Sequence, residues 1–236
     1  PGPDAVDASQ LRGLLEEHDL SLAAVGTGAG WVKHQLTLTH FDTDRRRAAI
    51  DFVTAIIHFA GQFGASAIIG SMQGRHDAEV SRDTAFEYLR RALDQLGPLA
   101  EQHGVPLIYE PLNRYETNLC NTLEDGCELL NDLDTDNVLL LADLFHMNIE
   151  EVRVGDAIHR AANRVGHVHF VDSNRQPVGA GHLDMAAVMA ALKAVSYDGY
   201  LSAEALPLPD SMTAAQQTMQ AFRRWTSTYP LEDQAS

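Results

Sequence analysis

Short apolar segments alternate with longer amphipathic segments along the whole chain. The apolar segments are continuous and do not alternate strictly with polar residues, which is typical of parallel strands buried on both faces. The pattern therefore predicts six parallel strands, at residues 21–28, 66–71, 106–110, 137–143, 165–172 and 200–206.

The segments between these strands repeat apolar residues at helical spacing. Residues 44–63 form one such segment, and in the next one Thr84 and Glu87 fit a capping box while Gly104 fits a helix end. Further helices are expected near Leu11, Leu14 and Leu15 and at about 122–133, 153–163, 184–195 and 212–226.

A strand followed by a helix, repeated, predicts a right-handed parallel α/β architecture. A closed (β/α)₈ TIM barrel needs eight strands, two more than the pattern contains. We therefore expect a single TIM-barrel domain over residues 1–236 that is incomplete at its N-terminus, because a strand–helix–strand unit would precede Pro1. No GxGxxG motif follows a strand, so a dinucleotide-binding fold is not indicated.

Charge and composition exclude several kinds of partner. The formal net charge is −16, and Lys33 and Lys193 are the only lysines. A nucleic acid or an anionic membrane would need a basic surface, so neither is expected. No apolar run is long enough to span a membrane, and no signal peptide is visible.

The chain has two cysteines, Cys120 and Cys127, and no CxxC pair. A disulfide scaffold or a thiolate zinc site is therefore not indicated. Reduced cysteines agree with a cytoplasmic location, which we expect for this protein.

Potential metal ligands stand at the carboxyl ends of four successive predicted strands. They are Glu110, Asp143, His169 and Glu204. Active sites of barrels lie at this end of the strands. Three carboxylates and one imidazole suit Mn²⁺, with Mg²⁺ or Co²⁺ as alternatives, better than a metal that prefers thiolates.

Each of these residues also has a purely structural interpretation. Glu110 could face solvent, Asp143 could cap a turn, His169 could be a hydrogen-bonded core histidine, and Glu204 could pair with an arginine. His167 and His169 point the same way from their strand, and His169 is nearer the strand end. We therefore expect His169 to be the ligand and His167 to be a hydrogen-bonded core residue.

Four motifs carry a resemblance to a known family. They are "EPLNRYETNLCNT", "ADLFHMNIEE", "HVHFVDSNR" with "GAGHLD", and "GYLSAEALPLP". Together they resemble the sugar phosphate isomerase/epimerase superfamily, which has a xylose-isomerase-like TIM barrel. Within it, the chain is most similar to D-tagatose 3-epimerase-type epimerases of ketoses and keto-sugar acids.

The resemblance implies a function and a set of roles. A divalent metal would be held by Glu110, Asp143, His169 and Glu204. Glu110 and Glu204 would also be the two catalytic bases, which remove the C3 proton on one face of an enediolate and return it on the other. The substrate hydroxyls would be bound by Glu116, His146 and Arg175.

Other functions remain open at this stage. A hydroxypyruvate isomerase would need the same cluster and a smaller pocket. An endonuclease-IV-like DNA repair enzyme would need further histidines and a basic groove, and a non-catalytic sugar-binding barrel would bind no metal. Arg75 could hold a substrate carboxylate or pair with a surface acid, and Trp31 could cover the pocket or close the barrel edge. We expect a small-molecule sugar as partner and a homo-oligomer.

Overall fold

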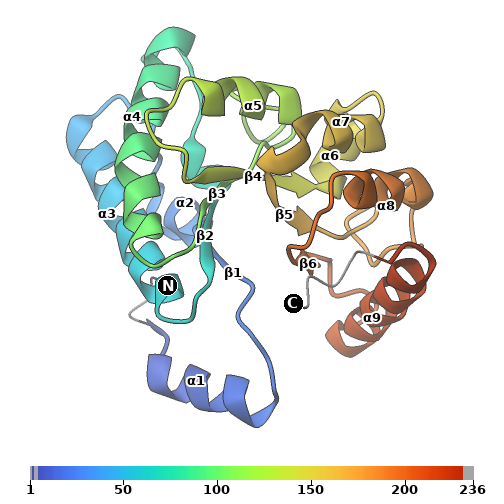
Figure 1. The fold of residues 1–236 in the computed structure, drawn as a ribbon. Coiled ribbons are helices and arrows are strands. Elements are labelled where there is room, and N and C mark those ends of the chain that lie inside the picture. Colours follow the sequence, from blue (N-terminus) through green and yellow to red (C-terminus); the bar gives the residue numbers. More distant parts are fainter. Residues whose placement is uncertain (1, 3–4, 231–236) are drawn as a thin grey trace. The chain divides into compact units, whose positions relative to one another are not determined.

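The computed structural model describes residue 2 and residues 5–230 (Figure 1). The chain forms two compact units. Unit 1 comprises Pro1–Glu110, Arg114–Cys120 and Glu128–Leu139, and unit 2 comprises Pro111–Asn113, Asn121–Cys127 and Leu140–Ser236. The single domain expected from the sequence stays a prediction.

Unit 1 is built on three parallel strands. They are β1 (Ala24–Gly26), β2 (Ser66–Ile69) and β3 (Leu107–Tyr109). In the register of this sheet, Ala24 lies opposite Ser66, and Ile68 lies opposite Ile108. Its helices are α1 (Ala8–Glu17), α2 (Ala29–His34), α3 (Thr43–Gly61), η2 (Ser71–Gln73) and α4 (Arg82–Glu101).

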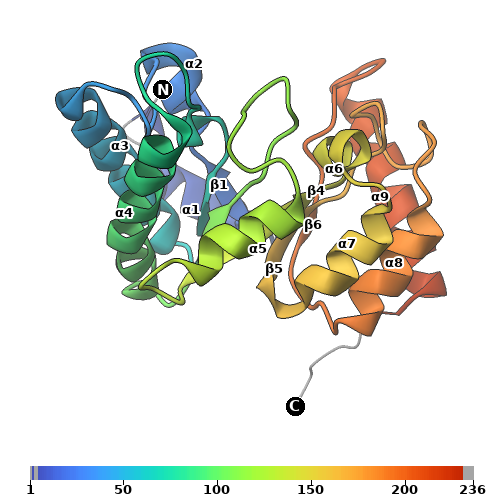
Figure 2. The same cartoon turned by 90° about the horizontal axis from the view of Figure 1, so that it is seen from above.

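Helices α3 and α4 lie side by side in unit 1 (Figures 1 and 2). The buried face of α4 includes Leu89, Leu93 and Leu96, which are fully enclosed. The predicted capping box is wrong, because the helix begins one turn earlier. Ser81 is the N-cap, and its hydroxyl accepts the backbone N–H of Thr84 at 3.3 Å.

Unit 2 contains the second set of parallel strands. Strand β4 (Val138–Asp143) begins in unit 1 and continues into unit 2, where it pairs with β5 (Val165–His169), which pairs with β6 (Leu201–Ser202). Helices α7 and α8 lie side by side (Figures 1 and 2). The helices of this part are α5 (Leu123–Asn131, which also crosses the unit boundary), α6 (Leu144–Glu150), α7 (Val154–Ala161), η3 (Ala162–Arg164), α8 (Met185–Ala194) and α9 (Ser211–Thr228).

The six predicted strands and their parallel direction are confirmed, although all six are shorter than expected. Two short α-helices, α2 and α6, were not predicted. Each spans fewer than two full turns, so neither gives a repeat of apolar residues long enough to recognise.

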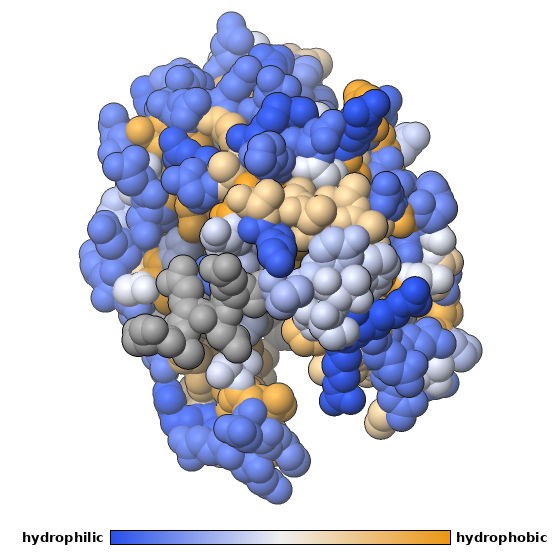
Figure 3. Space-filling model, turned by 45° about the vertical axis from the view of Figure 1, so that its right-hand side comes forward, coloured by the Kyte–Doolittle hydropathy of each residue, from blue (hydrophilic) through white to orange (hydrophobic). Residues whose placement is uncertain are grey.

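Polar residues make up most of the visible surface (Figure 3). The face shown in Figure 3 carries mostly hydrophilic residues, with hydrophobic residues in separate patches. Among the described residues, no helix has the length and apolar character needed to cross a membrane.

Candidate active site

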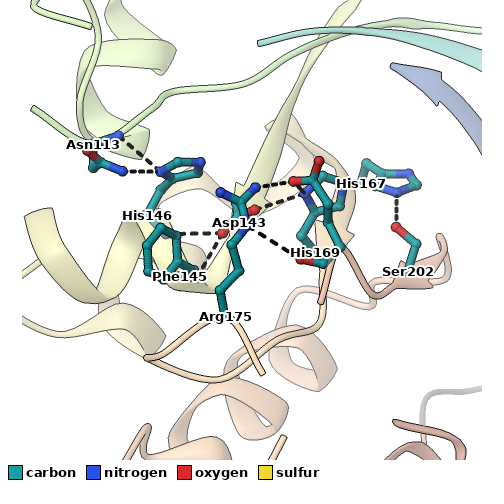
Figure 4. Close-up of polar contacts among 9 residues, drawn as sticks. Asn113, Asp143, Phe145, His146, His167, His169, Arg175 and Ser202 are labelled. Atoms are coloured by element: carbon teal, nitrogen blue, oxygen red, sulfur yellow. Dashed lines mark hydrogen bonds and ion pairs between the residues drawn. The ribbon is translucent and has the colours of Figure 1, made fainter. Parts of the chain in front are cut away.

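Asp143 ends strand β4 and at the same time begins helix α6. One carboxylate oxygen, Oδ1, accepts the backbone N–H groups of Phe145 at 2.8 Å and His146 at 3.0 Å (Figure 4). The other oxygen, Oδ2, lies 2.9 Å from Nδ1 of His169. Asp143 therefore does act as a cap, as one interpretation of the sequence allowed. Only one of its carboxylate oxygens is used for capping, and the other faces β5.

The surroundings of Asp143 favour its charged form. Burial raises the pKa of this carboxyl, since the residue is 1% exposed. The hydrogen bond from His169 and the nearby imidazoles outweigh burial, and the resulting pKa lies below the ordinary value. Asp143 is therefore a carboxylate at neutral pH.

The two histidines of β5 have different partners. Their ring centroids lie 5.6 Å apart, in keeping with side chains two residues apart on one strand. Nδ1 of His169 faces Asp143 and lies 3.7 Å from Oε2 of Glu204, whereas Nε2 of His167 lies 2.7 Å from the Ser202 hydroxyl. Burial, followed by the charge of His169, lowers the pKa of His167 to about 4, so His167 is a neutral hydrogen-bonded residue.

Glu204 follows β6 and pairs with Arg175, as one interpretation of the sequence allowed. The Arg175 guanidinium forms an ion pair with Oε2 of Glu204 and lies 5.1 Å from the centre of the Phe145 ring. Arg175 has a left-handed backbone conformation, with φ of 58°. The arginine expected at the substrate therefore contacts one expected metal ligand directly.

His146 is held in a defined tautomer. Its Nδ1 accepts the backbone N–H of Asn113 at 3.2 Å and lies 2.7 Å from the Asn113 side-chain amide (Figure 4). Because Nδ1 acts as an acceptor, the proton of the neutral ring is on Nε2. The side chain is 2% exposed and can donate from Nε2.

Asp172 is a further residue of the site that sequence reasoning missed. Its carboxylate accepts the backbone N–H groups of Ser173 and Gly179 at 2.7 Å and of Leu183 at 3.1 Å. It thereby orders the loop that carries Arg175. A Cβ at Gly181 would lie 2.2 Å from Oδ1 of Asp172, so the loop closes tightly over this carboxylate. The joint presence of "VDSNR" and "GAGHLD" was the available signal.

Replacing Asp172 by Ala is expected to lower the free energy of unfolding by about 2–4 kcal/mol, since three part-buried N–H groups lose their acceptor. Asp198→Ala, at an exposed loop aspartate, is the matched control.

The stabilisation by Asp172 should also depend on pH. Burial raises the pKa of Asp172, but the backbone hydrogen bonds that it accepts lower the pKa by more, so the pKa in the folded state lies below the ordinary value. The stabilisation is present above the unfolded pKa and is lost as pH falls below about 4. Thermal unfolding of both variants across this range measures the effect, and an equal loss in the two would contradict it.

Glu110 follows β3 in unit 1, where Gln73 fixes its main chain. The Gln73 amide donates to the Glu110 carbonyl at 2.9 Å and to the Gly70 carbonyl at 3.1 Å. Its Oε1 accepts the Tyr109 hydroxyl at 2.6 Å. Gln73 is 0% exposed, so these hydrogen bonds are made without competition from water.

Replacing Gln73 by Leu is expected to destabilise the protein by about 2–4 kcal/mol, because a buried hydroxyl and two carbonyls lose their partner. Gln95→Leu, at an exposed position of α4, should change the free energy of unfolding by less than about 0.5 kcal/mol. Urea denaturation of both variants compares them. Similar midpoints would show that Gln73 does not anchor the end of β3.

The structure therefore assembles three of the four expected ligands, Asp143, His169 and Glu204, within unit 2, with Arg175 beside them. Glu110 and Glu116 belong to unit 1. Two carboxylates and an imidazole nitrogen that point toward one another form a donor set that fits a divalent cation with a preference for oxygen and nitrogen.

Comparison with known proteins gives a consistent result. The family model described as xylose isomerase-like TIM barrel matches residues 1–225. A solved structure of an L-ribulose 3-epimerase has a TM-score of 0.77 and 26% identity to this chain, and the match covers 95% of this chain and 81% of that one.

Two curated relatives match over shorter segments. The L-ribulose 3-epimerase of Mesorhizobium japonicum is 36% identical over 157 residues, or 66% of this chain and 53% of the relative. The 3-dehydro-D-guloside 4-epimerase of Escherichia coli is 35% identical over 133 residues, or 56% of this chain and 47% of the relative. The matched segments thus span about half the length of these relatives.

Proposed function

Because this chain belongs to the xylose isomerase-like TIM barrel family, we propose that it carries the active site of a metal-dependent sugar epimerase. The observation that supports this most directly is the meeting of Asp143, His169 and Glu204 at the carboxyl ends of β4, β5 and β6. The activities for which the relatives are named, 3- and 4-epimerisation of sugars, are of the same class.

Glu110 completes the proposed metal site as a fourth ligand, with Asp143, His169 and Glu204 as the others. Three carboxylates favour Mn²⁺, with Mg²⁺ or Co²⁺ as alternatives. When bound, the ion supplies a Lewis acid that makes the proton beside the substrate carbonyl more acidic.

Glu110 and Glu204 are the proposed bases. One glutamate, as a carboxylate, removes the proton from the carbon next to the carbonyl and becomes protonated, and the other, in its protonated form, delivers its proton to the opposite face of the same carbon. The ion pair with the Arg175 guanidinium orients the Glu204 carboxylate.

Three further residues bind the substrate in this proposal. His146 donates from Nε2 to a substrate oxygen, because its Nδ1 is occupied by Asn113. Arg175 neutralises charge that develops on the substrate oxygens, and the Glu116 carboxylate accepts a hydrogen bond from a substrate hydroxyl. The protein is proposed to act in the cytoplasm as a homo-oligomer.

Removal of the metal is the first test of this function. The full-length protein, dialysed against EDTA, should lose epimerase activity by at least about 100-fold and regain it on addition of Mn²⁺. The substrates are L-ribulose, D-psicose, a 3-keto-glucoside and hydroxypyruvate, and the epimer ratio is followed by NMR. Activity on hydroxypyruvate alone would favour the isomerase, and no metal binding would favour a non-catalytic barrel.

A further inference from the structure

A cavity of about 680 Å³ lies within unit 1, between α2 and the loops that follow β2 and β3. All of its lining residues belong to unit 1. Aromatic and polar side chains line it together, among them Trp31, Phe41, Tyr115, Gln35, Arg75 and Glu116.

Buried hydroxyl groups hold the floor of this cavity in place. The Thr117 hydroxyl donates to the Gly74 carbonyl at 2.8 Å, and the Thr39 hydroxyl donates to the Gln73 carbonyl at 3.1 Å. Both threonines are at most 2% exposed. Gly74 has φ of 85°, and a Cβ there would lie 2.2 Å from the Thr39 hydroxyl oxygen. Only glycine fits this floor, so the cavity has a fixed shape.

The loops on either side of the cavity are joined to each other. The His76 N–H donates to the Asn118 side-chain oxygen at 2.9 Å, and the Asn118 amide donates to the His76 carbonyl at 3.0 Å. This pairing gives Asn118, the last residue of the "EPLNRYETN" motif, a structural role that needs no contact with a substrate. It places Arg75 and Glu116 on two loops that are held together.

The aromatic side chains of the cavity remain accessible. Trp31 is 39% exposed and Tyr115 is 76% exposed. A Cβ at Gly30 would lie 2.3 Å from the Met72 sulfur, so α2 packs tightly and holds Trp31 in position. An accessible aromatic ring beside amide, guanidinium and carboxylate groups is suited to a sugar ring, whose C–H face packs on the aromatic ring while its hydroxyls reach the polar groups.

The volume of the cavity indicates how large a molecule it can hold. Cavities of about 300–1,000 Å³ hold molecules of drug-like size, which is also the size of a disaccharide. Glu116, already assigned to a substrate hydroxyl, lines the cavity. We propose that this cavity is a second sugar subsite that holds the non-reacting ring of a glycoside, so that the substrates are keto-glycosides and not free ketoses. The inference rests on the proposed function through Glu116.

A fluorescence titration tests the subsite without relying on turnover. Trp31 and Trp225 are the two tryptophans of the chain, so Trp225→Phe leaves Trp31 as the reporter. Cellobiose, maltose and phenyl β-glucoside are titrated against glucose in metal-free full-length protein. At least one two-ring compound should give a saturable change in Trp31 fluorescence at a concentration about tenfold below that for glucose.

Tyr115→Ala, added to Trp225→Phe, should weaken that binding about tenfold, whereas Tyr229→Ala in unit 2 should not change it. Equal affinity for glucose, no saturation with any of the three compounds, or no effect of Tyr115→Ala would overturn the subsite. Epimerisation without such binding would leave the proposed function intact, and binding without epimerisation would overturn the proposed function.

Discussion

Glu110→Gln and Glu204→Gln are each expected to slow net epimerisation by about 10²–10⁴-fold, because one general base is lost in each variant. Glutamine keeps the shape of the side chain and a weaker oxygen ligand. The remaining base still takes the proton from its own epimer. Each variant should therefore exchange that proton with solvent deuterium in one epimer only, and the two variants should exchange opposite epimers.

The exchange must be measured by NMR in full-length protein with its metal content confirmed, because both glutamates are also proposed ligands. Glu128→Gln, at an exposed position of α5, is the matched control and should retain both exchange reactions. If the two metal-loaded variants exchange the same epimer, the assignment of one base to each face is wrong. A single-base mechanism would then describe the enzyme better.

Asp143→Asn is expected to weaken Mn²⁺ binding by at least about 100-fold while the protein remains folded. Asparagine can still accept the N–H groups of Phe145 and His146, so the start of α6 is preserved. It cannot supply the negative charge that faces His169. Calorimetric titration with Mn²⁺ measures the first effect, and thermal unfolding measures the second.

The control for this variant is Asp184→Asn. Asp184 caps α8 in the same unit by accepting the Ala187 N–H at 3.1 Å. Its replacement should leave the affinity for Mn²⁺ unchanged. A similar loss of affinity in both variants would show that Asp143 acts through the fold and not as a ligand.

The sequence predicted the strands and the residues at their ends because burial on both faces leaves a clear apolar signal. It could not decide between capping and metal binding for Asp143, since one carboxylate has two oxygens and the structure uses both. Likewise, Glu204 was expected either to pair with an arginine or to bind a metal, and Arg175 is the arginine that it contacts.

Contacts between loops were beyond the reach of the sequence. The role of Asp172 depends on N–H groups as far along the chain as Leu183. Gly74 is likewise enclosed by two residues distant in sequence, since Thr117 donates to its carbonyl and the Thr39 hydroxyl occupies the space where a Cβ would lie. Such contacts have no periodicity, so only the folded chain shows them. That Glu110 and Glu116 join the cluster around His169 stays a prediction.

The double use of the Asp143 carboxylate limits which amino acids this position can hold. Asparagine, serine and threonine would begin α6 equally well but would bring no negative charge to His169. Glutamate would bring the charge, but its longer side chain is poorly suited to capping the helix from the residue that immediately precedes it. Aspartate alone satisfies both demands, so a search for distant members of this family can treat position 143 as restricted to a single residue type.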